Sequence, residues 1–226
     1  MDEGREKSVK KSHGIWLPDH DTWLPDHFKG GHREHGLGTY QFYLLKETVG
    51  FCTKFRTAVD VGGHVGLWSM WLAGMFDRVE AFEPFEPHAD CFKRNVHQKN
   101  VSLNQFALGD VEKRWSLETR DGNSCITYLT TDGHKSTKTV RLDDLGLESV
   151  DLMKIDVEGF EEPVARGAMR TIERDRPVIC AEYWPRLEKV RFGLPERGAI
   201  FFLESLGYRI ARHYDESNVI MVHEGK

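Results

Sequence analysis

The sequence predicts an α/β protein built around a mostly parallel sheet of seven strands, with helices on both faces and an antiparallel hairpin at one edge. Three observations support this prediction. From Thr57 onward, short apolar segments alternate with amphipathic segments, which is typical of parallel strands joined by helices. A glycine-rich turn at 62–66 separates the first strand from a helix. The turn at 215–217 is too short for a crossover, so the last two strands must be antiparallel.

The first half of the predicted sheet contains three strands and two helices. Residues 57–61 are Thr-Ala-Val-Asp-Val, and their three β-branched side chains favour a strand. The helix at about 67–76 is apolar nearly all round and should be deeply buried. A second strand at 78–82 leads to a helix at about 87–98, which begins with proline and has apolar residues at helical spacing. The third strand is expected at 102–108.

The segment that follows is different in composition. Residues 111–142 are rich in Thr, Asp and Gly, which predicts hairpins rather than a helix. A fourth strand is expected at 150–156. A helix should begin at Glu161, and its shared apolar face is formed by Val164, Ala168 and Ile172.

The chain should end with a fifth strand, a short helix and the hairpin. These elements are expected at 177–183, about 199–206, 208–214 and 218–223.

Residues 1–50 have no sustained apolar period before Tyr40 and are expected to form a His/Trp-rich arm or lid over a domain of residues 51–226. Within the arm, Trp-Leu-Pro-Asp-His occurs at 16–20 and again at 23–27, which predicts two similar turns with each Leu extended before Pro. Five of the 11 histidines lie in the first 35 residues, and they are His13, His20, His27, His32 and His35.

Composition excludes several classes of protein. A net charge of -5 and a pI near 6.1 argue against a general electrostatic grip on nucleic acid. The four cysteines are widely spaced, so neither a zinc knuckle nor a disulfide framework is predicted. The first residues are polar and no later apolar run could span a bilayer, which predicts a cytoplasmic protein without a membrane partner. The oligomeric state is left open.

The glycine-rich turn is a candidate nucleotide site. Gly62 and Gly66 would permit a tight turn, and Glu83, about twenty residues further on, could accept hydrogen bonds from both hydroxyls of a ribose. Dinucleotides and S-adenosylmethionine (SAM) both use this arrangement. The G-G-x-x-G spacing, the preceding Asp60 and the antiparallel edge favour SAM.

Five motifs carry a family resemblance. In order they are Val59-Asp60-Val61-Gly62, Ala81-Phe82-Glu83-Pro84, Ala107-Leu108-Gly109-Asp110, Arg141-Leu142-Asp143-Asp144-Leu145, and Lys154-Ile155-Asp156-Val157-Glu158-Gly159-Phe160-Glu161. Over roughly residues 57–184 the sequence resembles the FkbM-type SAM-dependent methyltransferases. The resemblance implies a Rossmann-like class I methyltransferase fold with the strand order 3-2-1-4-5-7-6, and SAM as cofactor.

The resemblance also assigns cofactor-binding residues, which are Asp60, Gly62, Gly63, His64, Val65, Gly66, Glu83, Pro84, Phe106, Ala107, Leu108 and Asp156. It implies that Glu83 binds the ribose, that 106–108 border the adenine, and that Asp156 faces the methionine part. Family members commonly have Ala-Asn where this chain has Gly63-His64. His64 therefore either replaces that Asn at the cofactor or is a partly exposed loop residue.

Candidate catalytic residues follow the fourth and fifth strands. Asp156, Glu158 and Glu182 should lie side by side at the carboxyl edge of the sheet, where crowded carboxylates raise one another's pKa. Asp156 is the preferred base and Glu182 the second candidate, whereas Glu158 is expected to serve as helix N-terminal charge. Lys154 is a third candidate, although pairing with Asp156 is the preferred interpretation.

The expected reaction is O-methylation of a hydroxyl on a sugar or other small polar acceptor, with a carboxylate base. No Asn-Pro-Pro-Tyr-like or Pro-Cys motif for DNA-base methylation is present, and Glu182 stands where a ribose 2'-O-methyltransferase would need lysine. No metal is assigned, because Asp26, His27, His32 and His35 match no known zinc spacing. The alternatives are an NAD(P)-dependent oxidoreductase and a catalytically inactive SAM-binding regulatory module.

Overall fold

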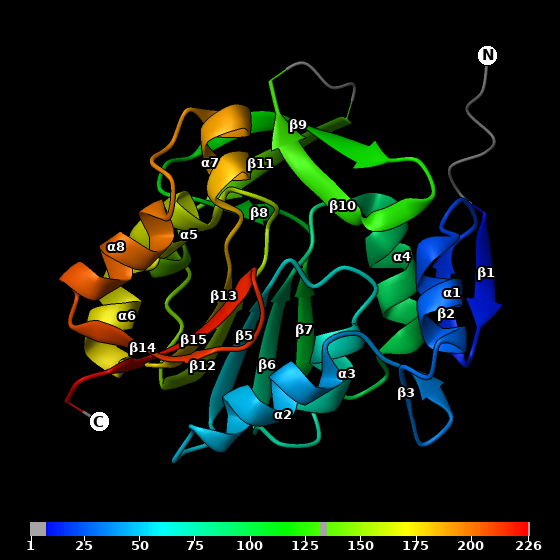
Figure 1. Ribbon diagram of the computed structural model, residues 1–226, viewed down its shortest axis with the longest axis horizontal. Coiled ribbons are helices and arrows are strands. Elements are labelled where there is room, and N and C mark those ends of the chain that lie inside the picture. Colours follow the sequence, from blue (N-terminus) through cyan, green and yellow to red (C-terminus); the bar gives the residue numbers. More distant parts are fainter. Residues whose placement is uncertain (1–7, 132–134, 226) are drawn as a thin grey trace.

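The computed structural model describes residues 8–131 and 135–225, and a seven-stranded sheet lies at its centre (Figure 1). The strands of this sheet are, in spatial order, β14 (Tyr208–His213), β15 (Asn218–His223), β13 (Val178–Glu182), β12 (Val150–Ile155), β5 (Thr57–Val61), β6 (Arg78–Phe82) and β7 (Val101–Asn104). β15 is antiparallel to both β13 and β14, and the pairs from β13 to β7 are parallel. The predicted strand order is therefore confirmed.

Helices cover both faces of the large sheet because its central strands are apolar on both sides. Every residue of β5, β12 and β13 is buried. On one face the core includes residues of α2 (Phe42–Gly50) and α3 (Leu67–Leu72). On the other face it includes residues of α5 (Glu161–Gly167), α6 (Met169–Asp175) and α8 (Gly198–Ser205).

The insertion contains the predicted antiparallel pairing, between β9 (Lys113–Arg120) and β10 (Asn123–Thr130) and between β9 and β11 (Lys135–Val140), and these strands belong to a second sheet. The order of this sheet is β10, β9, β11 and β8 (Ala107–Leu108). The predicted third strand at 102–108 is therefore wrong in one respect, because the chain leaves the large sheet after Asn104 and β8 pairs with β11. The four-stranded sheet lies beyond the carboxyl ends of the large sheet's strands (Figure 1).

The described part of the arm, residues 8–50, is packed on the rest of the chain. It contains β1 (Val9–Ser12), β2 (Ile15–Pro18), α1 (Trp23–Lys29), β3 (Arg33–Glu34), β4 (Leu37–Gly38) and α2. Leu17, Leu24 and Phe28 are fully buried in one cluster with Val65 and Cys91. Burying each such side chain stabilises the fold by about 1.5–3 kcal/mol, so the arm is an integral layer.

The two Trp-Leu-Pro-Asp-His copies adopt different structures, which corrects the prediction of two similar turns. The first copy lies in β2, paired with β1, and ends in a turn. The second forms α1, where Pro25 occupies the first turn and so removes no helical hydrogen bond. The Asp21 carboxylate accepts a hydrogen bond from the Leu24 backbone N–H at 3.0 Å and caps this helix.

Several helices differ from their predicted bounds. The helix expected from Glu161 is divided at Ala168 into α5 and α6, although its predicted apolar face is buried as expected. α3 ends at Leu72, and α4 spans Glu86–Asn95. α7 (Pro185–Phe192) was not predicted, although proline at its first turn and Gly193 with φ +67° after its end are the usual signals.

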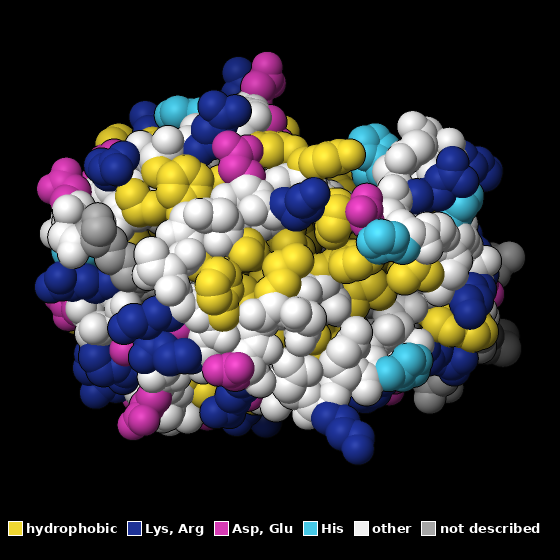
Figure 2. All heavy atoms as spheres, turned by 90° about the horizontal axis from the view of Figure 1, so that it is seen from below, with side chains coloured by type: hydrophobic (Ala, Val, Ile, Leu, Met, Phe, Trp, Pro, Cys, Tyr) yellow, Lys and Arg dark blue, Asp and Glu magenta, His cyan; other side chains and the backbone are white. Residues whose placement is uncertain are grey.

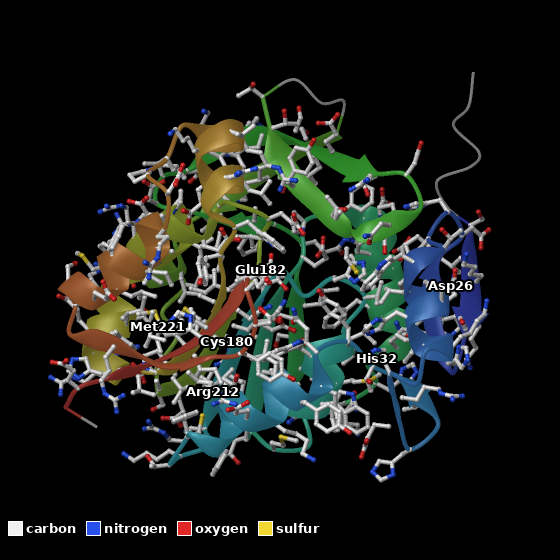
Figure 3. The ribbon with its side chains drawn as sticks, viewed as in Figure 1. Asp26, His32, Cys180, Glu182, Arg212 and Met221 are labelled. Carbon is white, nitrogen blue, oxygen red and sulfur yellow. The ribbon has the colours of Figure 1, made fainter. Side chains whose placement is uncertain are left out.

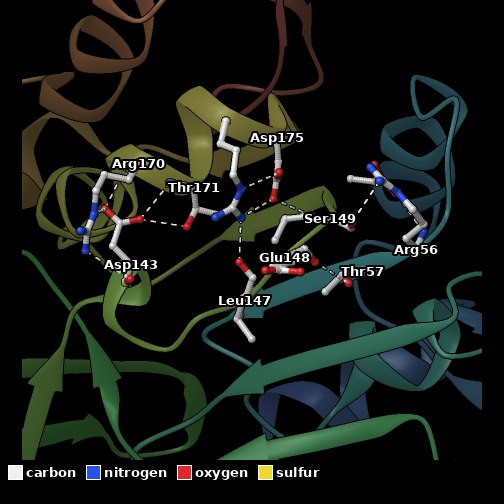
Figure 4. Close-up of polar contacts among 12 residues, drawn as sticks. Arg56, Thr57, Asp143, Leu147, Glu148, Ser149, Arg170, Thr171 and Asp175 are labelled. Atoms are coloured by element: carbon white, nitrogen blue, oxygen red, sulfur yellow. Dashed lines mark hydrogen bonds and ion pairs between the residues drawn. The ribbon is translucent and has the colours of Figure 1, made fainter.

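Polar contacts fix the connection between β11 and β12 at the edge of the sheet opposite the insertion (Figure 4). The Asp143 carboxylate, in a 3-10 turn (Leu142–Asp144), accepts hydrogen bonds from the backbone N–H and hydroxyl of Thr171, each at 2.9 Å. Arg56 donates to the Ser149 hydroxyl at 3.0 Å. The contact between Arg56 and Ser149 joins the residues just before β5 and β12, which pair in parallel. Residues 154–158 therefore lie at the carboxyl end of the sheet, beside the insertion.

On the surface, hydrophobic side chains gather across the middle of the face seen from below, which carries α2 (Figure 2). Tyr43 and Phe51, at the two ends of this helix, are among the exposed large apolar residues. In the described ranges, every helix is too short or too polar to cross a membrane.

Candidate active site

The turn after β5 has a backbone that only glycine accommodates well. Gly62 and Gly66 have φ of +81° and +91°, in the left-handed region. A Cβ at Gly62 would overlap the backbone carbonyl oxygen of Asp156, and one at Gly66 would collide with Val96. The Phe82 carbonyl accepts hydrogen bonds from the N–H groups of Gly62 and Gly63, both at 3.0 Å. The turn is thus held close to the ends of β6 and β12.

Glu83, at the end of β6, orders this turn. One carboxylate oxygen accepts a hydrogen bond from the His64 N–H, and the other accepts one from the Phe85 N–H, each at 2.8 Å. The side chain is buried, and Oε1 is also 3.5 Å from His88 Nδ1, whereas Oε2 keeps a second acceptor position. Glu83 can therefore hold the turn and still accept a hydrogen bond from a ligand.

A cavity with an empty volume of about 930 Å³, including its open mouth, lies over the turn. Most of the predicted cofactor and catalytic residues line it, namely Gly62, Gly63, His64, Glu83, Pro84, Ala107, Leu108, Lys154 and Asp156. The remaining ones lie outside its lining, namely Asp60, Val65, Gly66, Phe106 and Glu182. The structure thus brings nine of the fourteen predicted site residues to one cavity.

The five others have different surroundings. Val65 is fully buried against the arm, and Gly66 precedes α3 as its N-cap. Phe106 lies between β7 and β8 and packs edge-on against Phe82. Asp60 is buried beneath the turn, and Glu182 lines a neighbouring cleft.

A buried ion-pair network lies beneath the turn. Lys154 Nζ is 3.5 Å from the Asp60 carboxylate and 3.4 Å from that of Asp156, and it donates a hydrogen bond to the Gly62 carbonyl at 2.8 Å. Ser69 donates to the other Asp60 oxygen at 2.6 Å. Burial acts to lower the pKa of Lys154, but the charges of Asp156 and Asp60 outweigh it and raise that pKa. The predicted pairing of Lys154 with Asp156 is confirmed.

Three carboxylates meet at the carboxyl ends of β12 and β13, as predicted. Asp156, Glu158 and Glu182 each have an oxygen within 4.8 Å of the other two. Burial and then the Asp156 charge raise the pKa of Glu158 to about 7. Burial, followed by Asp156 and Glu158, also raises the pKa of Glu182 well above its ordinary value. In Figure 3, Glu182 lies in the interior, at the end of β13.

The expectation that Glu158 serves as charge at the N-terminus of a helix is wrong. Glu158 lies three residues before α5, with φ +59°, and is therefore not part of the first helical turn. Arg191 of α7 contacts its carboxylate at 3.1 Å. The acid at the start of the helix is Glu161, whose side chain accepts hydrogen bonds from the N–H groups of Val157 and Gly159, both at 3.0 Å. Glu158 is directed into the site instead.

His64 connects three parts of the chain. Its Nε2 is 2.8 Å from the hydroxyl of Ser124 in β10, and that hydroxyl donates a short hydrogen bond to the Asp21 carboxylate of the arm. Because a carboxylate only accepts, His64 must donate to Ser124 through Nε2. Burial and then the charge of His88 keep the pKa of His64 well below its ordinary value, so the ring is neutral. His64 is a partly exposed residue of the loop after β5, as one of the two alternatives expected, and it also lines the cavity, so its role at the cofactor stays a prediction.

Several residues that line the cavity were not predicted from the sequence. His88 of α4 packs edge-on against His64 with ring centroids 4.3 Å apart, and Cys125 and Tyr128 come from β10. Tyr40, from the arm, also lines the cavity. Cys125 and Tyr128 belong to the insertion, where no motif marked them in advance.

The histidines of the arm make ring contacts. His27 stacks on His32 with centroids 3.7 Å apart and on Trp23 at 4.8 Å. In Figure 3, Asp26 and His32 lie on the arm, away from Glu182. In the described ranges, the group with metal-binding separations is that of the three carboxylates, which contains no arm residue.

Acidification is expected to loosen the arm. Burial and then His32 lower the pKa of His27 from 6.5 to about 4. Between these two pH values the unfolded arm binds more protons than the folded arm, so the stability conferred by the neutral ring is lost as the pH falls from 6.5 to 4. Hydrogen exchange of residues 15–28, corrected for intrinsic rates, should be faster at pH 4.5 than at pH 7. His27→Phe keeps an aromatic ring and should reduce this difference; an equal response in that variant would contradict the assignment.

The family is shown by comparison with known proteins. The model of the methyltransferase FkbM domain matches residues 60–210. The chain belongs to the FkbM methyltransferase family. Methyltransferase 1 of Beauveria bassiana (strain ARSEF 2860) is 26% identical over 190 residues, which cover 68% of this chain and 72% of that relative. The predicted family is confirmed, and the protein is a SAM-dependent methyltransferase.

Solved structures show the same fold. Methyltransferase FkbM from Methylobacillus flagellatus KT is similar with a TM-score of 0.52 and 16% identity, over 76% of this chain and 45% of that chain. The match thus spans less than half of the M. flagellatus protein. A Streptococcus mutans protein in complex with S-adenosylhomocysteine (SAH) has a TM-score of 0.50 and 12% identity, over 81% of this chain and 98% of that chain. The class I methyltransferase fold is confirmed.

Proposed function

We propose that this FkbM-family methyltransferase transfers the methyl group to a hydroxyl of a sugar or a similar small polar acceptor. The observation that carries the proposal is a second, open cleft with an empty volume of about 2200 Å³, which meets the cofactor cavity. Tyr40, Cys125, Tyr128 and Glu158 line both spaces. An acceptor in the cleft therefore reaches the cofactor cavity beside the three carboxylates.

The cofactor cavity fits SAM on two structural grounds. The turn containing Gly62 and Gly63 lines the cavity, where its backbone is held against the end of β6, and the buried Glu83 carboxylate retains an acceptor position suited to a ribose hydroxyl. Ala107 and Leu108 supply an apolar wall suited to adenine, and Asp156 lies on the side that adjoins the carboxylate group. These placements support the roles that the family resemblance assigns to the four residues.

The cleft has the chemistry of a carbohydrate site. Trp23 and Trp184 line it, with 38% and 42% of their surfaces exposed. Such rings can pack on the C–H face of a sugar while neighbouring polar groups bind its hydroxyls. Arg120, Arg186 and Glu196 line the same cleft and offer both donors and acceptors. A purely apolar acceptor would leave these groups without partners.

The residues contribute mainly alignment and proton removal. When bound, SAM supplies a methyl group on a sulfonium, and the group moves to the acceptor oxygen while the electron pair of the broken C–S bond stays on sulfur. Lys154 fixes the Asp156 carboxylate, and the group of Asp156, Glu158 and Glu182 is placed to receive the hydroxyl proton. Lys154 is fully committed to its carboxylates and the Gly62 carbonyl, so its role is positioning.

Acceptor binding and cofactor binding should be separable. Trp184→Ala is expected to raise the KM for a sugar acceptor by about tenfold, because an aromatic contact is removed, while SAH affinity changes less than twofold. Phe201→Ala, which removes another exposed aromatic ring on α8, is the matched control and should change neither. Labelled SAM with a panel of sugars, glycosides and non-sugar alcohols gives the activity, and isothermal titration gives the SAH affinity.

Two results would overturn the proposal. Methylation of a nitrogen acceptor with no transfer to any hydroxyl would exclude O-methylation. SAH binding without transfer to any acceptor, in the panel or in cell extract, would favour the inactive regulatory module. The oxidoreductase alternative is already disfavoured, because the chain belongs to a methyltransferase family.

A further inference from the structure

We propose that Asp156, Glu158 and Glu182 bind a divalent cation at the junction of the two cavities, and that this ion binds the acceptor hydroxyl. Binding of the cation depends on the residues of this chain alone. Binding of the acceptor hydroxyl to the ion rests on the proposed function, because it assumes that a hydroxyl acceptor occupies the cleft.

The separation of the three carboxylates suits one cation. Each residue offers an oxygen within 4.8 Å of the other two. Oxygen ligands lie about 2.0–2.6 Å from Mg²⁺ or Ca²⁺, so two ligands of one ion can be as much as about 4–5 Å apart. Two strand ends, β12 and β13, and the loop before α5 hold the three residues, which gives the group a rigid frame.

Glu182 supplies a second, independent indication. Its side chain is buried, with 6% of the residue exposed, and its Oε2 atom has no hydrogen-bond partner. An ionised carboxylate buried without a partner is strongly unfavourable. The two cationic side chains that contact the group pair with its other members, Lys154 with Asp156 as well as Asp60, and Arg191 with Glu158. The hydrogen-bond partner that the Glu182 side chain does have, Asp156, belongs to the same group of carboxylates, so a bound cation would provide the partner that Oε2 lacks.

The ligand set indicates the class of ion. All three ligands are carboxylate oxygens, which suit Mg²⁺, Mn²⁺ or Ca²⁺ better than Zn²⁺ or copper. Three protein ligands leave further coordination positions open. Glu158 lines both spaces and Glu182 lines the cleft, so the open positions are accessible from the acceptor side. Two neighbouring hydroxyls of a sugar could fill two of these positions.

The ion would assist transfer by polarising the hydroxyl. Coordination to a cation lowers the pKa of a bound oxygen ligand. The hydroxyl proton would then leave to a water molecule in the open cleft, while the oxygen forms the bond to the methyl carbon and the C–S electron pair remains on sulfur. In the ion-loaded enzyme the carboxylates act as ligands, and the proton acceptor is solvent.

Mn²⁺ binding to the full chain in the presence of saturating SAH tests the proposal. Electron paramagnetic resonance should show one saturable Mn²⁺ per chain, displaced by Mg²⁺ or Ca²⁺. Glu182→Gln should weaken Mn²⁺ binding by at least about tenfold, while SAH affinity changes less than twofold because Glu182 lies outside the cofactor cavity. Glu112→Gln, at an exposed position, removes the same charge elsewhere and should leave Mn²⁺ binding unchanged. Glu158→Gln is a second test of the ligand set if Glu182→Gln does not fold.

The outcomes separate this inference from the proposed function. Absence of saturable Mn²⁺ binding, or equal weakening in Glu112→Gln, would overturn the cation site. If Mn²⁺ does not bind while SAH still binds and methyl transfer to a sugar proceeds in EDTA, the cation site fails and the proposed function stands. If Mn²⁺ binds with the expected loss in Glu182→Gln but no hydroxyl is methylated, the site stands, whereas the assignment of its open positions to a hydroxyl fails.

Discussion

Gly62→Ala is expected to abolish measurable SAH binding and to lower the free energy of unfolding by about 3 kcal/mol or more. The residue has φ +81°, and the added Cβ would overlap the backbone carbonyl oxygen of Asp156. Because the obstacle is backbone at the end of β12, a side-chain rotation cannot relieve it. The turn would have to move away from β12, which would displace the cavity wall and the Lys154 hydrogen bond to the Gly62 carbonyl. Isothermal titration with SAH and urea unfolding measure the two effects.

Gly74→Ala is the matched control for this change. Gly74 follows α3 with no positive φ, and an added Cβ would be 3.6 Å from its nearest neighbour, the Trp71 carbonyl oxygen. We expect the free energy of unfolding to change by less than about 1 kcal/mol and SAH affinity to be unaltered. Near-normal SAH affinity in Gly62→Ala would place the cofactor away from this turn and would contradict the proposed binding mode.

The central strands and the antiparallel last pair were predictable because their determinants are local, whereas the strand order was implied by the family resemblance. The central strands are apolar on both faces, which is a property of short sequence segments. The turn at 215–217 forces an antiparallel last pair, and Asp215 holds it by accepting hydrogen bonds from the backbone of Ser217 and Asn218 at 2.8 and 2.7 Å. The convergence of Asp156 and Glu182 also followed, because parallel neighbours end at the same edge.

The remaining parts of the site depend on contacts that no local pattern encodes. Ser124 is 60 residues from His64 and 103 from Asp21, yet the three side chains form one hydrogen-bonded chain. Glu158 enters the site through its left-handed backbone and Arg191, a residue 33 positions away on a helix that was not predicted. Such pairings arise from tertiary packing.

The repeated pentapeptide shows the same limit within one chain. Its first copy forms β2 because Lys10 and Lys11 of β1 pair with Leu17 and Trp16. Its second copy becomes a helix because Asp21 caps it and β10 fixes Asp21 through Ser124. Identical local sequence is therefore consistent with both structures, and the neighbours decide between them.

Lys154→Met is expected to destabilise the protein by about 3–5 kcal/mol, because it leaves two acidic side chains without their cation. Asp60 is fully buried, so water cannot replace the ammonium group there, whereas the Asp156 side chain is 18% exposed and lines the cavity. The Gly62 carbonyl would also lose its hydrogen bond, and SAH affinity should fall together with stability. Urea unfolding gives the free energy. Lys189→Met is the control, because its ion pair with Glu196 is exposed and should contribute less than about 1 kcal/mol.

A second substitution distinguishes an unpaired buried charge from lost packing. Asp60→Asn in the Lys154→Met background removes one of the two uncompensated carboxylates while keeping nearly the same volume. We therefore expect the double variant to be more stable than Lys154→Met alone by at least about 1 kcal/mol, although Asp60→Asn alone should destabilise the wild-type chain. Additive losses in the double variant would mean that the two residues act independently. The ion pair across β5 and β12 would then be incidental to the stability of the site.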